Sequence, residues 1–162
     1  MVKSKETWRQ KIVSTEKKQN LPKVSVIEGK STKIWGEGTL VIPSPVEVDK
    51  LMKEVPEGRL ITINQIRAYM AKKYNATIGC PITTGIFVGM AAKAAEEDNS
   101  EGNPDITPYW RTMKGKGELN DKYPGGVAEQ AEKLIAEGHE IVCDKAGNPK
   151  KVKNWEDKLV EI

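Results

Sequence analysis

The sequence predicts a mainly α-helical fold with short β elements, an α+β domain of modest size. Several stretches place apolar residues at the i, i+3, i+4 spacing of an amphipathic helix, and most of them start at a capping signal. Between them, short apolar runs bounded by glycine, proline and asparagine are typical of brief strands and turns. With 162 residues, 38% of them hydrophobic and 30% charged, the chain has room for one modest core.

The first 43 residues read as an extension in front of the main domain. Ser4, Trp8 and Ile12 share one face of a short predicted helix. The elements expected after it are a linker over residues 14–23, a strand over 24–29, and a glycine-rich loop over 29–45 that contains a short strand at 40–42. The predicted divisions of the chain are a basic extension over 1–43, a main domain over 44–143, and a C-terminal hairpin with a short helix over 144–162.

The main domain opens with a clearly marked helix start. Ser44 can cap the helix, Pro45 takes the first helical position where its missing N–H is harmless, and Glu47 completes a capping box. The apolar residues of this helix fall on one face, at Val48, Leu51, Met52 and Val55. Pro56 and Gly58 end it.

Two further helices follow after short turns. Thr62 and Gln65 form a second capping box, which opens a helix with its apolar face at Ile63, Ile66 and Met70 and its end at Asn75. A third helix begins near Thr83 or Thr84, with apolar residues at Phe87, Met90, Ala91 and Ala94 and an acidic end at 96–98. This arrangement suits a helix-turn-helix, although plain three-helix packing produces the same pattern.

The third helix carries two interior glycines, Gly85 and Gly89, four positions apart. Each costs a helix about 1 kcal/mol relative to alanine, so a face without side chains needs the close approach of another backbone as its reason. That backbone is nucleic acid in a winged-helix interpretation and a neighbouring protein segment in the alternative. The only cation on the helix is Lys93 and its end is acidic, which favours internal packing at least equally.

The remaining elements follow from turn residues. First come a turn at Pro108, a turn at 115–117 and a glycine pair at 125–126. A helix follows that ends at Gly138, and its apolar face is formed by Val127, Ala131, Leu134 and Ile135. The chain then forms a hairpin, with a strand over 139–143, a turn over 144–148 and a return strand over 149–153, and a short helix starts at Asn154.

Composition excludes several classes of function. No apolar run approaches the roughly 18 residues of a membrane span and no secretory leader is recognisable, so we expect a cytoplasmic protein. Cys80, Cys143 and His139 are all the soft metal ligands in the chain, one fewer than a closed zinc site needs. We therefore expect no metal and no cofactor, and the cysteines read as free thiols in a reducing compartment.

Charge is distributed unevenly along the chain. Residues 1–33 contain nine Lys/Arg and three Asp/Glu, which leaves seventeen and twenty for the rest of a chain whose net charge is +3. A basic segment can add affinity for phosphate backbones through counterion release. Alternatively, the basic segment is a solvated, poorly ordered tail without a binding role.

The order of motifs in the second half of the chain resembles a known family. The motifs are the turn Pro108-Tyr109-Trp110-Arg111, the loop Tyr123-Pro124-Gly125-Gly126, and the helix end Glu137-Gly138. They resemble the Pro-Cys-His-Arg turn, Tyr-x-Gly-Gly loop and Glu-Gly helix end of the methylated-DNA protein-cysteine methyltransferases. The resemblance runs from about Ser44 to Ile141 and implies a winged helix-turn-helix-like alkyltransferase C-terminal domain.

The resemblance also implies that the chain is not an enzyme. Tyr109 stands at the position of the family's methyl-accepting cysteine and Trp110 at that of the activating histidine. A phenol and an indole do not replace a thiolate and its base. The pattern is similar to that of the alkyltransferase-like proteins, which lack the cysteine and bind alkylated guanine without repairing it. A methyltransferase that uses a displaced cysteine is the third, least supported hypothesis.

The resemblance implies a set of DNA-binding residues. They are Tyr109, Trp110, Arg111, Tyr123, Gly125, Gly126 and Glu137 around a pocket for a modified base, and Gly85, Ile86 and Gly89 on the recognition helix. Ile86 and Ile63 take the positions of the family's intercalating arginine and phosphate-rotating tyrosine, which argues against efficient base flipping.

Each of these residues also has a structural interpretation. Tyr109 and Trp110 can be core aromatics whose polar tips find partners, and Arg111 can form a structural bridge to Glu137. The leading hypothesis is a monomer that binds double-stranded DNA, with a protein partner left open. The alternative is a repurposed winged-helix module that binds a protein or a small ligand and has no affinity for DNA.

Overall fold

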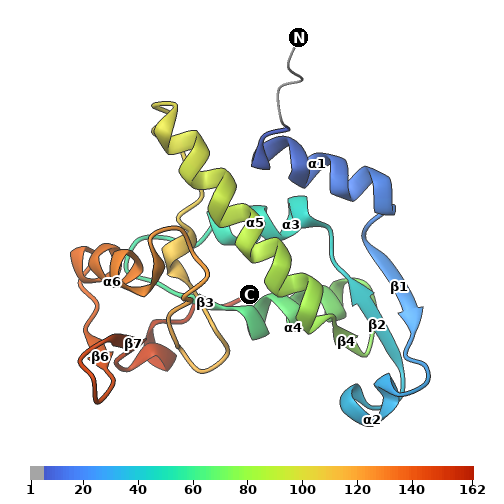
Figure 1. The fold of residues 1–162 in the computed structure, drawn as a ribbon. Coiled ribbons are helices and arrows are strands. Elements are labelled where there is room, and N and C mark those ends of the chain that lie inside the picture. The colour runs from blue at the N-terminus through green and yellow to red at the C-terminus, as the bar shows by residue number, and fades with distance from the viewer. Residues whose placement is uncertain (1–5) are drawn as a thin grey trace.

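The computed structural model describes residues 6–162 and shows an α+β fold in which helices predominate (Figure 1). The helices are α1 Trp8–Gln19, α2 Ser31–Trp35, α3 Pro45–Lys53, α4 Ile63–Lys73, α5 Pro81–Ser100 and α6 Gly126–Ala136, with 3-10 turns η1 Tyr109–Arg111 and η2 Trp155–Lys158. The strands are β1 Lys23–Val26, β2 Thr39–Ile42, β3 Ile61–Thr62, β4 Ile78–Gly79, β5 Thr112–Met113, β6 Ile141–Cys143 and β7 Pro149–Val152. The predicted fold class is therefore confirmed.

The strands form three small sheets that join the helices at their ends. β1 pairs with β2 in antiparallel fashion and β2 pairs with β4 in parallel, giving the order β1-β2-β4. β3 pairs in parallel with β5, which connects the start of α4 to the end of η1. β6 and β7 form the antiparallel hairpin predicted near the C-terminus.

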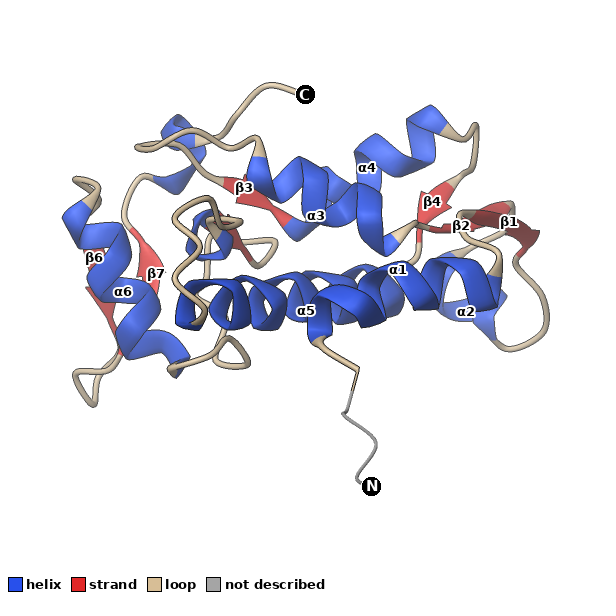
Figure 2. Ribbon diagram, turned by 90° about the horizontal axis from the view of Figure 1, so that it is seen from above, coloured by secondary structure: helices blue, strands red, loops and turns tan. Residues whose placement is uncertain are grey.

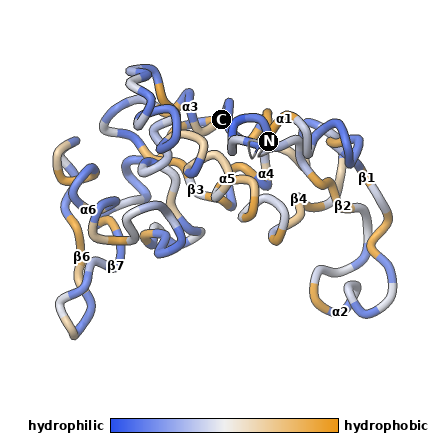
Figure 3. The backbone as a smooth tube through the Cα atoms, turned by 45° about the horizontal axis from the view of Figure 1, so that its top comes forward, coloured by the Kyte–Doolittle hydropathy of each residue, from blue (hydrophilic) through white to orange (hydrophobic). Residues whose placement is uncertain are grey.

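The main core lies between α5 and the helices beside it. Figure 2 shows α5 along one side of the molecule, with α3 and α4 on the other side of the core. The buried residues of this core include Val48, Met52, Ile66, Met70, Phe87, Val88 and Ala91. Figure 3 shows apolar segments where α5, β4 and β2 come together. A second cluster packs α6 against the hairpin, with Leu60, Met113, Leu119, Ala131, Leu134 and Val152.

The N-terminal helix is longer than expected, so the linker predicted over residues 14–23 is wrong for 14–19, whereas residues 20–22 do connect α1 to β1. Thr7 caps α1 in a capping box with Gln10, and the helix continues to Gln19, while Ser4 lies outside the described residues. Ile12 is buried, and α1 packs on α5 and α3. The linker prediction relied on polar composition, but tertiary contact on one face is enough to hold a polar helix.

Capping signals predicted most helix starts correctly. Thr62 and Gln65 form the expected capping box at α4. Ser44 caps α3 by accepting the N–H of Glu47, but the carboxylate of Glu47 binds Lys73 and Tyr74, so the second half of that capping box is wrong. α5 begins at Pro81, before the predicted threonines, because the thiol of Cys80 caps it.

The segment between β1 and β2 projects from the body of the protein, at the lower right of Figure 1. It contains α2, a short helix where the sequence predicted only loop, and residues of β1 are exposed along the whole strand. Among residues 6–162, no helix combines the length and the apolar character needed to cross a bilayer. Cys80 is buried and Cys143 is exposed, and they are not bonded to each other.

Candidate functional site

The turn that carries the family resemblance is wedged between two helices. η1 contacts both α5 and α6, and Pro108 fixes the backbone before its first residue. Tyr109 is only 1% exposed, and its hydroxyl donates a hydrogen bond of 2.7 Å to Oε1 of Glu96 on α5. Burial, and then the bonded carboxylate, raise the pKa of Tyr109 well above its ordinary value. The phenol is therefore neutral at any physiological pH.

Three aromatic rings pack edge to face at this turn. The ring of Tyr109 lies 5.4 Å from that of Trp110 and 5.2 Å from that of Tyr123, with interplanar angles of 79° and 74°. Such pairs are favoured by the quadrupoles of the rings. Tyr123 is 3% exposed, and its hydroxyl donates to the carbonyl of Thr112 at 2.9 Å. Burial also raises its pKa above the ordinary value.

A partly buried ion pair joins the turn to the end of α6. Arg111 donates to Glu137 from Nε at 2.9 Å and from Nη2 at 2.6 Å, and its Nη1 donates to the carbonyl of Val55 at 2.7 Å. Trp110 Nε1 donates to the same carboxylate at 3.0 Å. Burial by itself raises the pKa of Glu137, but the hydrogen bonds from Arg111 and Trp110 outweigh it and lower that pKa below the ordinary value.

These contacts close the aromatic pocket that the sequence predicted for a modified base. Both phenols are sealed from solvent and both hydroxyls are bonded, so neither Tyr109 nor Tyr123 reaches a ligand at the surface. The indole N–H of Trp110 and the guanidinium of Arg111 are also engaged within the protein. In this structure the four side chains make the internal contacts that their structural interpretation expects, and a role of theirs in binding a modified base stays a prediction.

The glycine pair shapes the start of α6. Gly125 has a φ of 80°, and a Cβ atom there would lie 1.8 Å from Oε2 of Glu129. Gly126 has a φ of 68° and donates its N–H to the carbonyl of Tyr123 at 2.8 Å. Left-handed backbone of this kind favours glycine. The two residues are accounted for by the turn itself, without a ligand.

The predicted residues on α5 lie in a different environment. A Cβ atom placed on Gly85 or Gly89 would have no heavy atom within 4 Å, so the helix backbone there is open. Ile86 is 54% exposed between them, and Ile82 one turn earlier is also exposed. Within the described residues, the alternative that these glycines accommodate a neighbouring segment of the same chain is therefore wrong. We call Ile82, Gly85, Ile86 and Gly89 the open face of α5.

The structure does not bring the two groups of predicted residues together. Tyr109 contacts α5 through Glu96, which is ten residues from Ile86. At about 1.5 Å per helical residue, this is about 15 Å along the helix. The closed aromatic site and the open face are thus two separate features of one helix.

The acidic end of α5 is neutralised by the protein itself. Glu97 accepts the backbone N–H of Trp8 at 2.6 Å. Asp98 accepts from Arg9 at 2.9 Å, and the other terminal nitrogen of Arg9 binds Asp49 at 2.6 Å. These carboxylates raise the pKa of Arg9 despite its partial burial. The acidic end therefore weighs less against an anionic ligand than the sequence suggested.

Sequence reasoning missed two polar residues near the start of α5. Arg67 on α4 donates from Nε to the carbonyl of Gly79 at 2.9 Å, two residues before α5 begins. A Cβ atom on Gly79 would lie 2.5 Å from the carbonyl oxygen of Arg67, so glycine is needed for this close approach. Asn64 is exposed one turn earlier on α4 and contacts Gly115. In the sequence, the only sign of this close approach between α4 and the start of α5 was a glycine, Gly79, just before a helix.

Comparisons with known proteins found a partial likeness. No protein-family model matches the chain, and no curated protein sequence matches it. Among solved structures, S. pombe Atl1 in complex with damaged DNA containing O6-carboxymethylguanine is similar at 18% identity and a TM-score of 0.49. S. pombe ATL in complex with DNA is similar at 19% identity and the same TM-score. Both matches cover 73% of this chain and 94% of the other, and the bound DNA is a property of those complexes.

Proposed function

We propose that this chain is a non-catalytic DNA-binding protein of the alkyltransferase-like type, which applies the open face of α5 to duplex DNA. The observation that carries the proposal is the empty space over Gly85 and Gly89. Two interior glycines cost the helix about 2 kcal/mol in total, and no contact among residues 6–162 accounts for them. A surface that must approach the helix backbone from outside does account for them.

The surroundings of the open face suit an anionic partner. Its first residue, Ile82, lies in the first turn of α5, where the helix dipole favours negative charge. Arg67 adds a cation at the corner between α4 and α5, and Asn64 adds an exposed amide. Ile86 is placed to press against a base step in the minor groove as an apolar wedge, as architectural proteins do.

The closed aromatic site has a structural role in this proposal. Tyr109 binds Glu96 on α5 and Arg111 binds Glu137 after α6, so the turn joins the two helices. Recognition of an alkylated guanine would need Tyr109 and Tyr123 to leave their buried positions. We therefore expect equal affinity for duplexes with and without 6-O-alkylguanine, and a clear preference for the alkylated duplex would show that the site opens.

A charge placed on the open face tests DNA binding directly. Ile86→Glu is expected to lower the affinity for a fluorescent 20-base-pair duplex at least tenfold, because the carboxylate repels phosphates and cannot wedge between bases. Ile135→Glu is the matched control, since Ile135 on α6 is 56% exposed and Ile86 is 54% exposed. Equal losses in the two variants, or none in either, would overturn the assignment of the open face.

A protein partner is the second candidate. Two exposed isoleucines one turn apart, Ile82 and Ile86, are also what a partner helix would bury. This candidate predicts no measurable duplex affinity at moderate salt for the unmodified protein, together with retained solubility of Ile86→Glu. The same titration therefore separates it from DNA binding.

A further inference from the structure

The projecting segment from the end of α1 to α2 carries a concentration of cations that the fold does not use. We call residues 17–37 the lysine arm. Within 17–33 the only acidic residue is Glu28, and the exposed lysines are Lys17, Lys18, Lys23, Lys30 and Lys33. Among residues 6–162, none of these five lysines forms an ion pair. The remainder of the chain, by contrast, is slightly acidic.

Leu21 and Ile27 anchor the lysine arm by burial, but packing does not explain its exposed residues. All four residues of β1 are exposed, and Val26 and Ile34 are among the most exposed large apolar side chains of the protein. Lysines on an edge strand can discourage unwanted strand pairing, which accounts for Lys23. It does not account for Lys30 and Lys33, because they lie at and beyond the start of α2.

The root of the lysine arm is joined to the start of α5. β1 pairs with β2 along its whole length, and β2 pairs with β4, placing Val41 opposite Gly79. The N–H of Cys80, the cap of α5, donates to the carbonyl of Val41 at 2.9 Å. Thr39 and Thr77 add a reciprocal pair of side-chain hydrogen bonds at the same root. A ligand on the open face therefore has the lysine arm in a defined position beside it.

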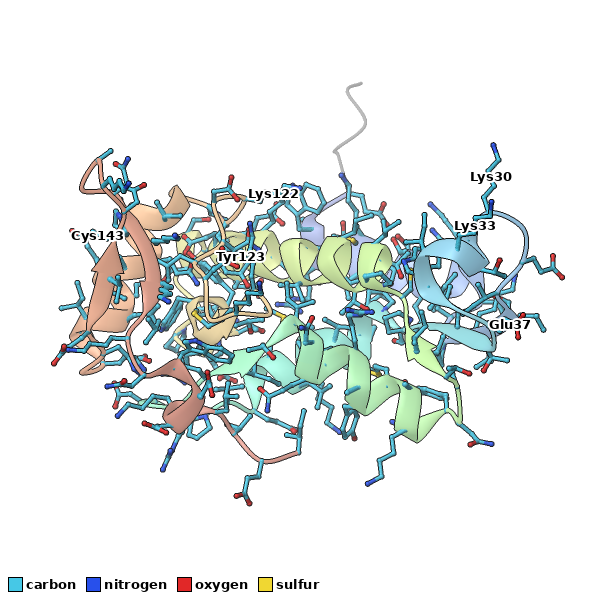
Figure 4. The ribbon with its side chains drawn as sticks, turned by 90° about the horizontal axis from the view of Figure 1, so that it is seen from below. Lys30, Lys33, Glu37, Lys122, Tyr123 and Cys143 are labelled. Carbon is cyan, nitrogen blue, oxygen red and sulfur yellow. The ribbon has the colours of Figure 1, made fainter. Side chains whose placement is uncertain are left out.

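Two lysines of the arm, Lys30 and Lys33, lie on the side of the molecule on which α5 lies. Figure 4 shows Lys30 and Lys33 on the same upper side as α5, whereas Glu37 lies at the outer edge of the arm. Lys122, in the loop before α6, is on that side as well (Figure 4). The three labelled lysines thus lie on the side of the molecule on which α5 lies.

We infer that the lysine arm is a second contact with the phosphate backbone of the DNA that the open face binds. This inference depends on the proposed function. α5 would occupy the groove, and Lys30 and Lys33 would neutralise phosphates beyond it. Counterions released from those phosphates add affinity without sequence preference and make it depend on salt. The lysine arm would thereby supply the positive charge that the open face of α5 lacks.

The salt dependence of binding tests the lysine arm. For the full chain and for the double variant Lys30→Gln/Lys33→Gln, the association constant for an unmodified duplex is measured from 50 to 300 mM salt. Each lost phosphate contact lowers the slope of log K against log salt by about 0.9, so the double variant is expected to lose about 1.8. At 0.1 M salt, this corresponds to an affinity loss of about eightfold per lysine.

The matched control is Lys50→Gln/Lys72→Gln, which removes the same charge from exposed lysines of α3 and α4, on the other side of the core. It is expected to leave the slope unchanged. If the two double variants give the same slope while Ile86→Glu abolishes binding, the proposed contact of the lysine arm with DNA is overturned, and the proposed role of the open face is supported. If the unmodified chain binds no duplex at any salt concentration, both the proposed function and the proposed contact of the lysine arm with DNA are refuted.

Discussion

Alanine at Gly85 and Gly89 should make the protein more stable and a poorer DNA binder. Neither glycine has a positive φ, and an added methyl group meets nothing within 4 Å. Each substitution should therefore raise the free energy of unfolding by about 1 kcal/mol, and the double variant by about 2 kcal/mol. In a protein of this size, each kcal/mol corresponds to an increase in Tm of about 2–4 °C.

The same two methyl groups project from the open face. If the α5 backbone must approach DNA closely, they hold the duplex away, and affinity should fall at least tenfold while stability rises. The opposite signs of the two effects separate a functional reason for the glycines from a purely structural one. Thermal unfolding and duplex titration on the same preparation measure both quantities.

Asn99→Ala is the matched control, because Asn99 is exposed on the far half of the same helix. It should stabilise the protein by about 0.5 kcal/mol and leave affinity unchanged. A Gly85→Ala/Gly89→Ala variant that is more stable and binds duplex as tightly as the parent would refute the reasoning. A variant that is less stable would show that the face is covered in solution.

Three further predictions concern the closed site and its neighbour. Glu137→Gln leaves the partly buried guanidinium of Arg111 without its partner charge and should lower the free energy of unfolding by about 2 kcal/mol, less than for a fully buried pair, measured by urea denaturation. Tyr109→Phe removes the bond to Glu96 and should cost about 1 kcal/mol without changing duplex affinity; a binding loss at unchanged stability would restore a direct role for the hydroxyl. Burial lowers the pKa of His139 from its ordinary 6.5, and neither ring nitrogen has a hydrogen-bond partner within the described residues. Because the unfolded chain takes up a proton that the folded chain resists, stability should fall as pH drops below about 6.5, and His139→Leu should flatten that part of the profile. The pKa of Glu137 is lowered, so its contribution is present above the pKa of the unfolded chain and is lost only in stronger acid; a profile that His139→Leu does not change would contradict the assignment.

Local chemistry in the sequence was sufficient for much of the fold. Capping residues such as Thr62 and Pro45 act within one helical turn, so their consequences are visible without tertiary information. The C-terminal hairpin follows from its turn residues in the same way. The structural bridge between Arg111 and Glu137 was one of two interpretations that the residue types allowed, and the structure selected it.

Tertiary structure decided the features on which function depends. The start of α1 has a local signal in the capping box of Thr7 and Gln10, but the rest of the helix is polar and persists to Gln19 because it packs on α5. Whether Tyr109 faces a cavity or a core depends on the packing of α5 and α6 around it, which residue spacing does not encode. The space over Gly85 and Gly89 is likewise a property of what the rest of the chain leaves uncovered. A sequence lists the side chains of a helix, but long-range packing determines which of its faces meets solvent.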